Sequence, residues 1–255
     1  NSRGMVAVKE GEIKTSDIEK VIDAAGAIAI PIDREVLHIL PKEYSIDGQE
    51  GIKEPLGMSG VRLECKAHIV TGAISSVQNI IKCTQKCDIS VNDIVLEQLA
   101  SSYSTLEEDE KDLGVVLVDI GGGTTDIAIF LNGSIQYTSV IAIGGQHFTN
   151  DIAIGLRTPQ QSAEQIKKRY GTAIFQSEYL NEEIEIPSIG NRPERFLKRQ
   201  ILVEILGPRV RETFELINRE IQNSGLMELL ASGIVITGGS SLLPGITEVA
   251  EEMTG

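Results

Sequence analysis

Between residues 115 and 131, two apolar segments are joined by a short turn that is rich in glycine. Val115–Ile120 and Ile127–Leu131 have the length and composition of buried β-strands. The turn between them consists of Gly121, Gly122, Gly123, Thr124, Thr125 and Asp126. Because glycine has no side chain, the backbone N–H groups can approach an anion closely, and we predict that the turn binds phosphate groups. Asp119 is predicted to hold a hydrated Mg²⁺ against these phosphates, and Thr124 and Thr125 to donate hydrogen bonds to them.

The strand that follows the turn distinguishes it from the familiar nucleotide-binding loops. Rossmann and Walker A motifs both lead into a helix, and the turn contains no Gly-Lys-Ser or Gly-Lys-Thr sequence. An ordinary glycine-rich β-turn is the alternative, although an apolar strand rarely carries a buried carboxylate that has no partner. An aspartate followed by glycines between two strands resembles the second phosphate motif of the superfamily that contains actin, Hsp70 and the sugar kinases.

A second glycine-rich segment, Gly233–Gly245, resembles the adenosine motif of the same superfamily. A short strand delivers Gly238, Gly239 and Ser240 to a place where a flat base could press against the backbone. A plain turn from strand to helix is the alternative. The order of the two motifs along the chain matches the superfamily and favours the adenosine site.

Between the two glycine-rich segments, Glu164 and Lys167 lie three residues apart on a predicted helix. The superfamily has a Glu-x-x-Lys helix at this point, and the resemblance implies that both residues contact the ribose and the adenine. The spacing alone equally fits an exposed ion pair on one face of the helix.

The composition limits the classes of function. With 255 residues, of which 41% are hydrophobic and 24% charged, the chain can bury the core of one large or two moderate domains. Its net charge of −14 repels phosphate backbones, so we expect no nucleic-acid binding through a broad surface. Cys65, Cys83 and Cys87 lack the spacing of a metal site, and no apolar run approaches the ~20 residues that span a bilayer.

Hydrophobic periodicity predicts an alternation of strands and helices. Besides the strands that flank the phosphate turn, the predicted strands are Met5–Lys9, Val36–Leu40, Tyr44–Ile46, Val61–Val70, Ile94–Leu96, Ile135–Ile143 and Gly233–Thr237. The predicted helices are one that begins at Thr15 or Ser16, Ser75–Cys87, Leu99–Leu106, Phe148–Leu156, Ser162–Tyr170, Phe196–Asn223 and one that begins near Pro244. Pro208 is expected to kink or divide its helix. The acidic run Glu107–Asp112 is expected to be a solvated loop.

Several further segments resemble the FtsA family of bacterial cell division proteins, over nearly the whole chain. They are Ile30–Pro41, Asp47–Gly51, Pro55–Gly60, His68–Gly72, Leu99–Ser104 and His147–Ala153. The resemblance implies an α/β, actin-like (RNase H-like) ATPase fold with the inserted subdomain 1C of FtsA, which is SHS2-like. It places subdomain 1C at residues 1–73, part of 1A at 74–112, 2A at 113–146 and 226–255, and 2B at 147–225. The start of 1A and the C-terminal membrane helix of FtsA have no counterpart in the sequence, so we expect a fragment.

The resemblance also implies what the protein does. FtsA proteins bind ATP and Mg²⁺, polymerise, and link the FtsZ ring to the cytoplasmic membrane at the division site, where they recruit later division proteins. Their subdomain 2B binds the C-terminal tail of FtsZ, which here singles out Arg209 and Glu212. Subdomains 1C and 2B form the filament contact, and 1C also binds other division proteins. Glu97 stands where superfamily ATPases orient the attacking water, with a packing or helix-start role as the alternative, so ATPase activity is expected to be weak at most.

Other members of the superfamily offer alternative functions. An actin-like ATPase of pilus assembly has the same fold and would differ most in subdomain 1C. A sugar or acid kinase would share the phosphate and adenosine motifs but would need a catalytic aspartate outside this sequence. A chaperone ATPase of the Hsp70 type would lack the segments between Ile30 and Gly72.

Overall fold

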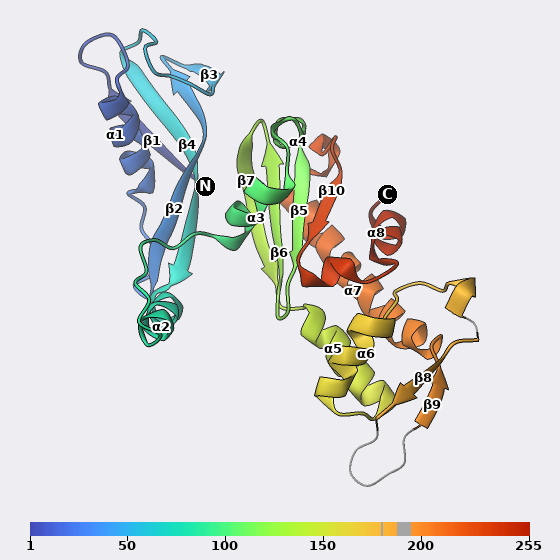
Figure 1. Ribbon diagram of the computed structural model, residues 1–255. Coiled ribbons are helices and arrows are strands. Elements are labelled where there is room, and N and C mark those ends of the chain that lie inside the picture. The colour runs from blue at the N-terminus through green and yellow to red at the C-terminus, as the bar shows by residue number, and fades with distance from the viewer. Residues whose placement is uncertain (180, 188–194) are drawn as a thin grey trace. The chain divides into compact units, whose positions relative to one another are not determined.

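The computed structural model describes residues 1–179, 181–187 and 195–255 (Figure 1). Its strands are β1 (Ser2–Ala7), β2 (Arg34–Ile46), β3 (Gln49–Ile52), β4 (Arg62–Ala73), β5 (Val115–Ile120), β6 (Thr125–Leu131), β7 (Ser134–Ile141), β8 (Glu183–Ile186), β9 (Arg195–Lys198) and β10 (Ile234–Thr237). Its α-helices are α1 (Thr15–Gly26), α2 (Ile74–Gln85), α3 (Glu97–Thr105), α4 (Glu108–Leu113), α5 (Gly145–Leu156), α6 (Gln160–Tyr170), α7 (Ile201–Ser224) and α8 (Ile246–Thr254). The described chain divides into two compact units, Asn1–Ala100 with Phe130–Tyr137, and Ser101–Ile129 with Thr138–Gly255.

The first unit is built on an antiparallel sheet with the strand order β1-β4-β2-β3. Helix α1 packs against β1 and β4 (Figure 1). A side chain at Gly4 would overlap the carbonyl oxygen of Val21 and the backbone nitrogen of Ala25. The backbone of the helix therefore rests directly on the strand, which only glycine allows.

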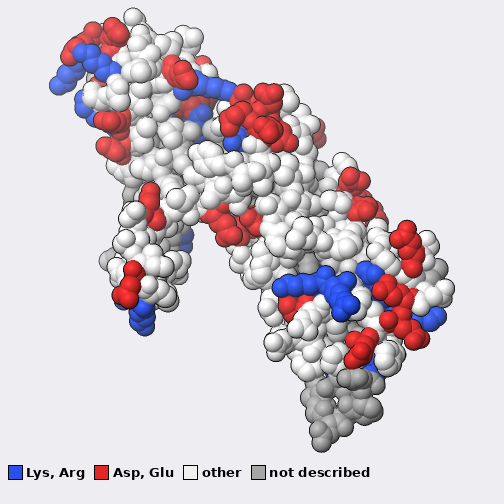
Figure 2. Space-filling model, viewed as in Figure 1, with Lys and Arg blue, Asp and Glu red and all other residues white. Residues whose placement is uncertain are grey.

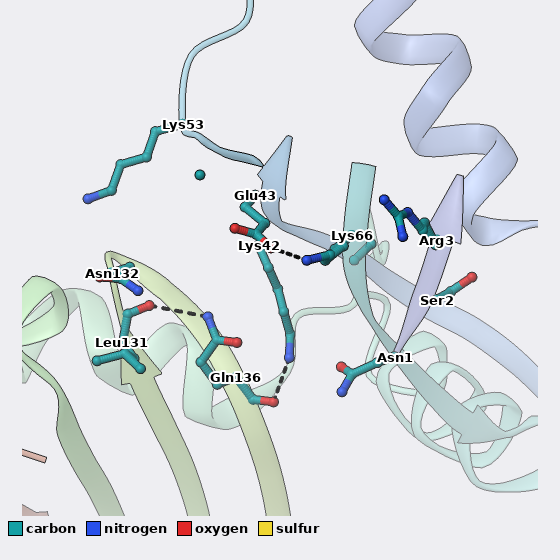
Figure 3. A pocket seen from close by; sticks show the side chains of 12 residues that line it. Asn1, Ser2, Arg3, Lys42, Glu43, Lys53, Lys66, Leu131, Asn132 and Gln136 are labelled. Carbon is teal, nitrogen blue, oxygen red and sulfur yellow. Dashed lines mark hydrogen bonds and ion pairs between the residues drawn. The ribbon is translucent and has the colours of Figure 1, made fainter. Parts of the chain in front are cut away.

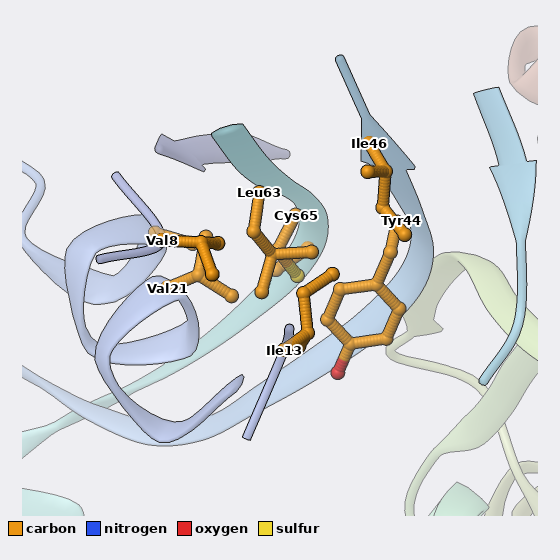
Figure 4. Close-up of a cluster of buried hydrophobic side chains, with 9 residues drawn as sticks. Val8, Ile13, Val21, Tyr44, Ile46, Leu63 and Cys65 are labelled. Atoms are coloured by element: carbon orange, nitrogen blue, oxygen red, sulfur yellow. The ribbon is translucent and has the colours of Figure 1, made fainter. Parts of the chain in front are cut away.

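The core of the first unit lies between α1 and the sheet, and Figure 4 shows its side chains meeting there. Its buried members are Val8, Ile13, Val21, Ala25, Tyr44, Ile46, Leu63, Cys65 and Ala67. Burial raises the pKa of the Cys65 thiol to about 11. Since the thiolate is the reactive form of cysteine, Cys65 acts here as a small apolar core residue.

The two strands predicted at Val36–Leu40 and Tyr44–Ile46 are parts of one strand, β2. The residues between them are Pro41, Lys42 and Glu43, whose lack of apolar character suggested an interruption. The register of β2 against β4 shifts between Pro41 and Glu43, so the chain passes this point through a bulge. A bulge tolerates a residue that has no N–H group for the ladder.

The second sheet has the strand order β10-β5-β6-β7. Strand β10 pairs in parallel with β5, and Thr237 lies opposite Asp119. Every residue of β5 is buried, as expected for a strand that is covered on both faces. The parallel pairing brings the carboxyl ends of β5 and β10 to the same edge of the sheet, which is where the two glycine-rich segments begin.

The remaining helices pack against one another in the second unit. Helix α5 contacts α6 and α7, α7 contacts α8, and β8 and β9 form an antiparallel hairpin. Helix α7 begins at Ile201 because Arg195–Lys198 forms β9, and the helix continues through Pro208 without being divided. Residues 180 and 188–194 of the predicted subdomain 2B lie outside the described residues.

The acidic segment Glu107–Asp112 is helical, and the predicted loop is wrong. The N–H of Glu107 donates to Glu110 Oε2 at 2.8 Å, and the carboxylates in the first turn interact favourably with the positive end of the helix. The side chain of Lys111 is buried, with its Nζ 5.2 Å from the ring centroid of Tyr103. These contacts anchor α4, and a charge pattern alone does not reveal them.

The segment Ile94–Leu96 forms no strand, contrary to the prediction. The N–H of Leu96 donates to Nε2 of His38 at 2.9 Å, so a side chain accepts the hydrogen bond that a neighbouring strand would have accepted. An apolar run of three residues is too short to distinguish a strand from a loop.

Acidic and basic side chains are interspersed over the face of the molecule shown in Figure 2. Among the described residues, no helix combines the length and the apolar character that crossing a membrane requires.

Candidate functional site

Asp119 lies near the carboxyl end of β5, and its side chain is buried. Its Oδ2 accepts a hydrogen bond from Ser101 Oγ of α3 at 2.8 Å. On its other side lies Gly238, where a Cβ would overlap Oδ1 of Asp119 and lie 2.6 Å from the carbonyl oxygen of Ile120. The two glycine-rich segments therefore meet at this carboxylate.

The phosphate turn is closed by its own hydrogen bonds. The N–H of Gly121 donates to the carbonyl oxygen of Thr124 at 3.0 Å, and Thr124 Oγ1 donates to Asp126 Oδ2 at 2.9 Å. Thr125 is fully buried, and its hydroxyl donates to the carbonyl oxygen of Ile143 at 2.8 Å. The only proton of the Thr125 hydroxyl is thus donated within the protein, and this hydrogen bond fixes the turn to Ile143.

A second carboxylate, that of Asp126, lies close to Asp119. Burial raises the pKa of Asp126, the hydrogen bond from Thr124 lowers it, and the negative charge of Asp119 raises it again; the net direction is upward. Two buried carboxylates that repel one another make a location that favours a cation.

The start of α5 is joined to the phosphate turn. The N–H of Gly145 donates to the carbonyl oxygen of Gly121 at 2.8 Å, and that of Gln146 donates to Gly122 at 2.7 Å. Ser240 Oγ, in the short 3₁₀ helix η3 (Gly239–Leu242), lies 3.4 Å from the same oxygen of Gly121. The turn, the start of α5 and the adenosine segment thus form one connected structure.

Glu164 and Lys167 form the predicted pair on α6, with Lys167 Nζ 2.7 Å from Glu164 Oε2. Thr149 of α5 lies between them: its hydroxyl donates to Glu164 and accepts from Lys167 Nζ at 2.9 Å. Lys167 Nζ also donates to the carbonyl oxygen of Gly145 at 2.9 Å. The pair is therefore part of a network between two helices, which goes beyond an exposed pair on one helix face.

The network keeps Glu164 ionised. Burial by itself raises the pKa of this carboxyl, but the hydrogen bonds from Lys167 and Thr149 lower it further, and the net direction is downward. An ionised carboxylate accepts hydrogen bonds and donates none, so it suits hydroxyl groups of a ligand.

These groups line a cavity of about 540 Å³ in the second unit. Its lining residues are Gly121, Gly122, Gly145, Gln146, Phe148, Glu164, Lys167, Lys168, Gly239, Ser240, Leu242, Leu243 and Pro244. Of the eleven predicted nucleotide-binding residues, six belong to this lining, and Asp119, Gly123, Thr124, Thr125 and Gly238 do not. The cavity combines apolar side chains for a flat ring with polar groups at its phosphate end, a size and composition usual for a small ligand.

Three glycines of the site have no reason within the fold to be glycine. A Cβ at Gly122, Gly123 or Gly239 would meet no atom within 4 Å, and none of the three has a positive φ. Every other described glycine has a positive φ, or a neighbour that a Cβ would press against. The free space beside these three backbones is therefore available to a ligand.

The sequence did not predict the contributions of Ser101, Gly145, Gln146 and Thr149. Ser101 lies in a segment that resembles FtsA, Leu99–Ser104, but serine in a helix indicates no particular chemistry. Gly145 follows Gly144, and two adjacent glycines before a predicted helix indicate only a turn. A Cβ at Gly145 would lie 2.6 Å from Ser240 Oγ, a close approach that becomes visible only in three dimensions.

The other predicted site residues lie apart from this network. Glu97 is the first residue of α3 and belongs to the first unit. Arg209 and Glu212 lie on α7, with Arg209 Nη1 2.5 Å from Glu212 Oε2. Arg209 also binds Asp151 of α5, through Nε at 2.6 Å and Nη2 at 3.2 Å.

A second cavity, of about 700 Å³, lies in the first unit (Figure 3). The stem of Lys42 crosses it, and Nζ donates to the carbonyl oxygen of Gln136 at 2.8 Å. Burial lowers the pKa of Lys42. Lys66 Nζ lies 2.6 Å from Glu43 Oε1 on the same wall of the cavity, so part of the positive charge of this wall is neutralised.

Within the part of the chain that the structure describes, no group of three or more His, Cys, Asp or Glu side chains could hold a metal ion by itself. A single carboxylate, such as Asp119, fits Mg²⁺ that keeps most of its water and is also bound by phosphates.

Comparison with solved structures shows the fold class. MreB5 of Spiroplasma citri bound to ADP has a TM-score of 0.58 at 24% identity, and the match covers 69% of this chain and 57% of that one. The PilM–PilN type IV pilus biogenesis complex has a TM-score of 0.61 at 16% identity, covering 100% of this chain and 64% of that one. The chain has the fold of an actin-like ATPase, as the sequence predicted.

Sequence comparison narrows this class to one family. The family described as "Cell division protein FtsA" matches residues 116–255, and the one described as "SHS2 domain inserted in FTSA" matches residues 1–71. FtsA of Pseudomonas aeruginosa is 56% identical over 253 residues, and FtsA of Escherichia coli is 42% identical over 260. The chain belongs to the FtsA family, which confirms the predicted family and its inserted subdomain. The match covers 99% of this chain and 61% of the Pseudomonas protein, so the chain spans about three fifths of its relatives' length.

Proposed function

We propose that the second unit holds Mg-ATP in its cavity and that the bound nucleotide controls the assembly of a cell division protein. The observation that carries this proposal is the free space beside Gly122, Gly123 and Gly239. A nucleotide whose phosphates and base press on these backbones accounts for all three glycines.

Each part of the site then has a task. Gly121, Gly122 and Gly123 offer backbone N–H groups to the phosphates, and Asp119 orients the water molecules of Mg²⁺. Glu164 and Lys167 bind the ribose and the adenine, and Ser240 with Gly238 and Gly239 supports the base. The phosphates of ATP carry the negative charge that such a site recognises. Glu97 is proposed to orient a water molecule for weak hydrolysis of the nucleotide.

Membership of the FtsA family supports the cellular role. We propose that the whole protein polymerises, links the FtsZ ring to the cytoplasmic membrane and recruits later division proteins. The tail of FtsZ binds at Arg209 and Glu212, whereas residues 1–73 contact other division proteins and subdomain 2B of the next copy. Attachment to the inner face of the membrane is assigned to the C-terminal amphipathic helix of FtsA proteins. Likeness to the pilus protein PilM concerns the fold alone and favours no role in pilus assembly.

Calorimetric titration of the full-length gene product with ATP, with and without Mg²⁺, tests the site. Gly239→Val is expected to weaken ATP binding tenfold or more, about 1.4 kcal/mol, because the side chain occupies the free space assigned to the base. Asp119→Ala should remove the part of the affinity that depends on Mg²⁺. Unchanged ATP affinity in Gly239→Val would contradict the proposed adenosine site.

A further inference from the structure

The carboxylate of Asp119 is held by groups from two other segments of the second unit. Ser101 Oγ donates to Oδ2 at 2.8 Å, and the backbone of Gly238 lies against Oδ1. We propose that Ser101 is a positioning residue that orients Asp119 toward the hydrated Mg²⁺ of the nucleotide. This inference rests on the proposed function of the site.

The geometry of Ser101 supports a directed hydrogen bond. The backbone around Ser101 is fixed, because its carbonyl oxygen accepts hydrogen bonds from Ser104 Oγ at 2.9 Å and Thr105 Oγ1 at 2.8 Å. The half-buried hydroxyl of Ser101 has one proton, and donating it to Asp119 fixes the direction of that hydroxyl. A helix 18 residues earlier in the chain thereby determines where one oxygen of Asp119 points.

Orientation matters at this carboxylate because its torsion is otherwise poorly defined. The χ2 angle of aspartate is broad, so a carboxylate without partners samples many orientations. Mg²⁺ demands near-octahedral geometry and retains several waters, so a ligand that acts through water must present its oxygen at a defined place. Groups that hold metal ligands in this way typically change metal affinity by 10–100-fold when they are removed.

Gly238 restrains the opposite oxygen. A Cβ at this position would overlap Oδ1, so the backbone of Gly238 packs closely against this oxygen and only a glycine leaves the carboxylate its place. With Ser101 on one oxygen and Gly238 on the other, removal of the hydroxyl leaves a single restraint. The expected result is a loss of Mg²⁺-linked affinity with nucleotide contacts elsewhere preserved.

The test compares the affinity of the full-length gene product for ATP in excess Mg²⁺ and in EDTA, by titration calorimetry. Ser101→Ala should weaken binding in Mg²⁺ by about tenfold, the lower end of the usual range, and leave binding in EDTA unchanged. Ser101→Thr keeps a hydroxyl and should restore at least part of the loss. Ser104→Ala is the matched control, because it removes an exposed hydroxyl of the same helix that bonds the carbonyl of Ser101 and not Asp119. Thr105 Oγ1 still bonds that carbonyl in this variant, so Ser104→Ala should bind ATP like the wild type in both Mg²⁺ and EDTA.

Each outcome decides the matter. Wild-type affinity in Ser101→Ala overturns the inference, as does an equal loss in Mg²⁺ and EDTA, which is the signature of a merely structural role. If Ser101→Thr recovers no affinity in Mg²⁺, this also contradicts the proposal that the hydroxyl of Ser101 orients Asp119. If the wild-type protein binds ATP equally in Mg²⁺ and EDTA, or not at all, the proposed function itself fails, and this result is distinct from the others.

Discussion

Gly238 and Gly239 are neighbours in the chain, but they are glycine for different reasons. Gly238 has a φ of +85°, and a Cβ there would overlap Asp119; Gly239 has neither restriction. We expect Gly238→Ala to lower the free energy of unfolding by about 2 kcal/mol or more, because left-handed backbone strain alone costs roughly 1–3 kcal/mol. Gly239→Ala should stay within about 0.5 kcal/mol of the wild type.

Urea unfolding at neutral pH without nucleotide measures both variants. The same large loss of stability in Gly239→Ala would show that the folded protein needs this glycine, and the argument for a ligand beside it would lapse. A Gly238→Ala protein as stable as the wild type would mean that the backbone at this position relaxes freely.

His68 on β4 should make the stability of the protein depend on pH. Burial is the largest cause that lowers its pKa from 6.5 to about 4, and the positive charge of Lys42 acts in the same direction. Below pH 6.5, His68 therefore binds a proton in the unfolded chain and stays neutral in the folded chain. Stability that is fully present above pH 6.5 is lost as the pH falls towards 4.

Chemical unfolding of the wild type and of His68→Gln, at intervals between pH 7 and pH 4.5, checks this dependence. At about 1.4 kcal/mol for each pKa unit, the contribution of His68 reaches roughly 3 kcal/mol at most. The free energy of unfolding of His68→Gln should fall less steeply on acidification. Parallel curves for the two proteins would exclude His68 as the cause.

The positions of the site residues were predictable where a motif crosses a turn, and less so where separate elements converge. Asp119 and the glycines after it follow from one strand-turn-strand pattern, and the Glu164–Lys167 ion pair follows from spacing on one helix. Ser101 and Thr149 were not predicted, because isolated hydroxyl residues occur in many helices and their partners come from other elements. Which tasks these residues perform stays a prediction.

Among helices and strands, long apolar patterns were predicted correctly and short or charged segments were not. Strands β5 and β6 and helices α5 and α6 lie within a few residues of their predicted bounds, because burial imposes a periodicity on their sequences. Helix α4 was not predicted, because the burial of Lys111 that stabilises it does not show in the charge pattern of the segment. Strand β9 was assigned to a helix because four residues are too few to reveal alternation.

Two of the arginines on helix α7, Arg209 and Arg211, differ in their surroundings and make a useful pair of variants. Arg209 binds Asp151 and Glu212, while Arg211 binds Glu252 of α8 through two hydrogen bonds, at 2.8 and 2.7 Å. Both arginines are therefore involved in internal ion pairs. The exchange of either for glutamate makes the same change in charge on the same helix.

We expect Arg209→Glu to weaken binding of a peptide from the FtsZ tail by about 1 to 3 kcal/mol, since the partner's carboxylate then meets a like charge. Arg211→Glu should have a smaller effect. Because Arg209→Glu also sets a negative charge against Asp151, circular dichroism must show an intact fold for both variants. Equal dissociation constants for the wild type and Arg209→Glu would move the docking site elsewhere.

For the whole molecule, the order of motifs was more informative than any single motif. The phosphate turn, the Glu-x-x-Lys helix and the adenosine segment follow one another as in the actin superfamily, and the matches at residues 1–71 and 116–255 agree with that order. The contacts define two compact units, whereas the resemblance implies four subdomains. Filament and partner contacts involve a second molecule, so neither this sequence nor this fold alone determines them.

Assembly tests the proposed contact between residues 1–73 of one copy and subdomain 2B of the next. Such a contact joins two different surfaces, and when its rotation does not close a ring it generates an open filament. Electron microscopy of the full-length gene product with ATP on lipid vesicles should show filaments, and removal of residues 1–73 should abolish them. The truncated protein must still bind Mg-ATP, which shows that the second unit remains folded. Filaments that persist after the truncation would contradict the proposal, because the second unit would then assemble through its own surfaces.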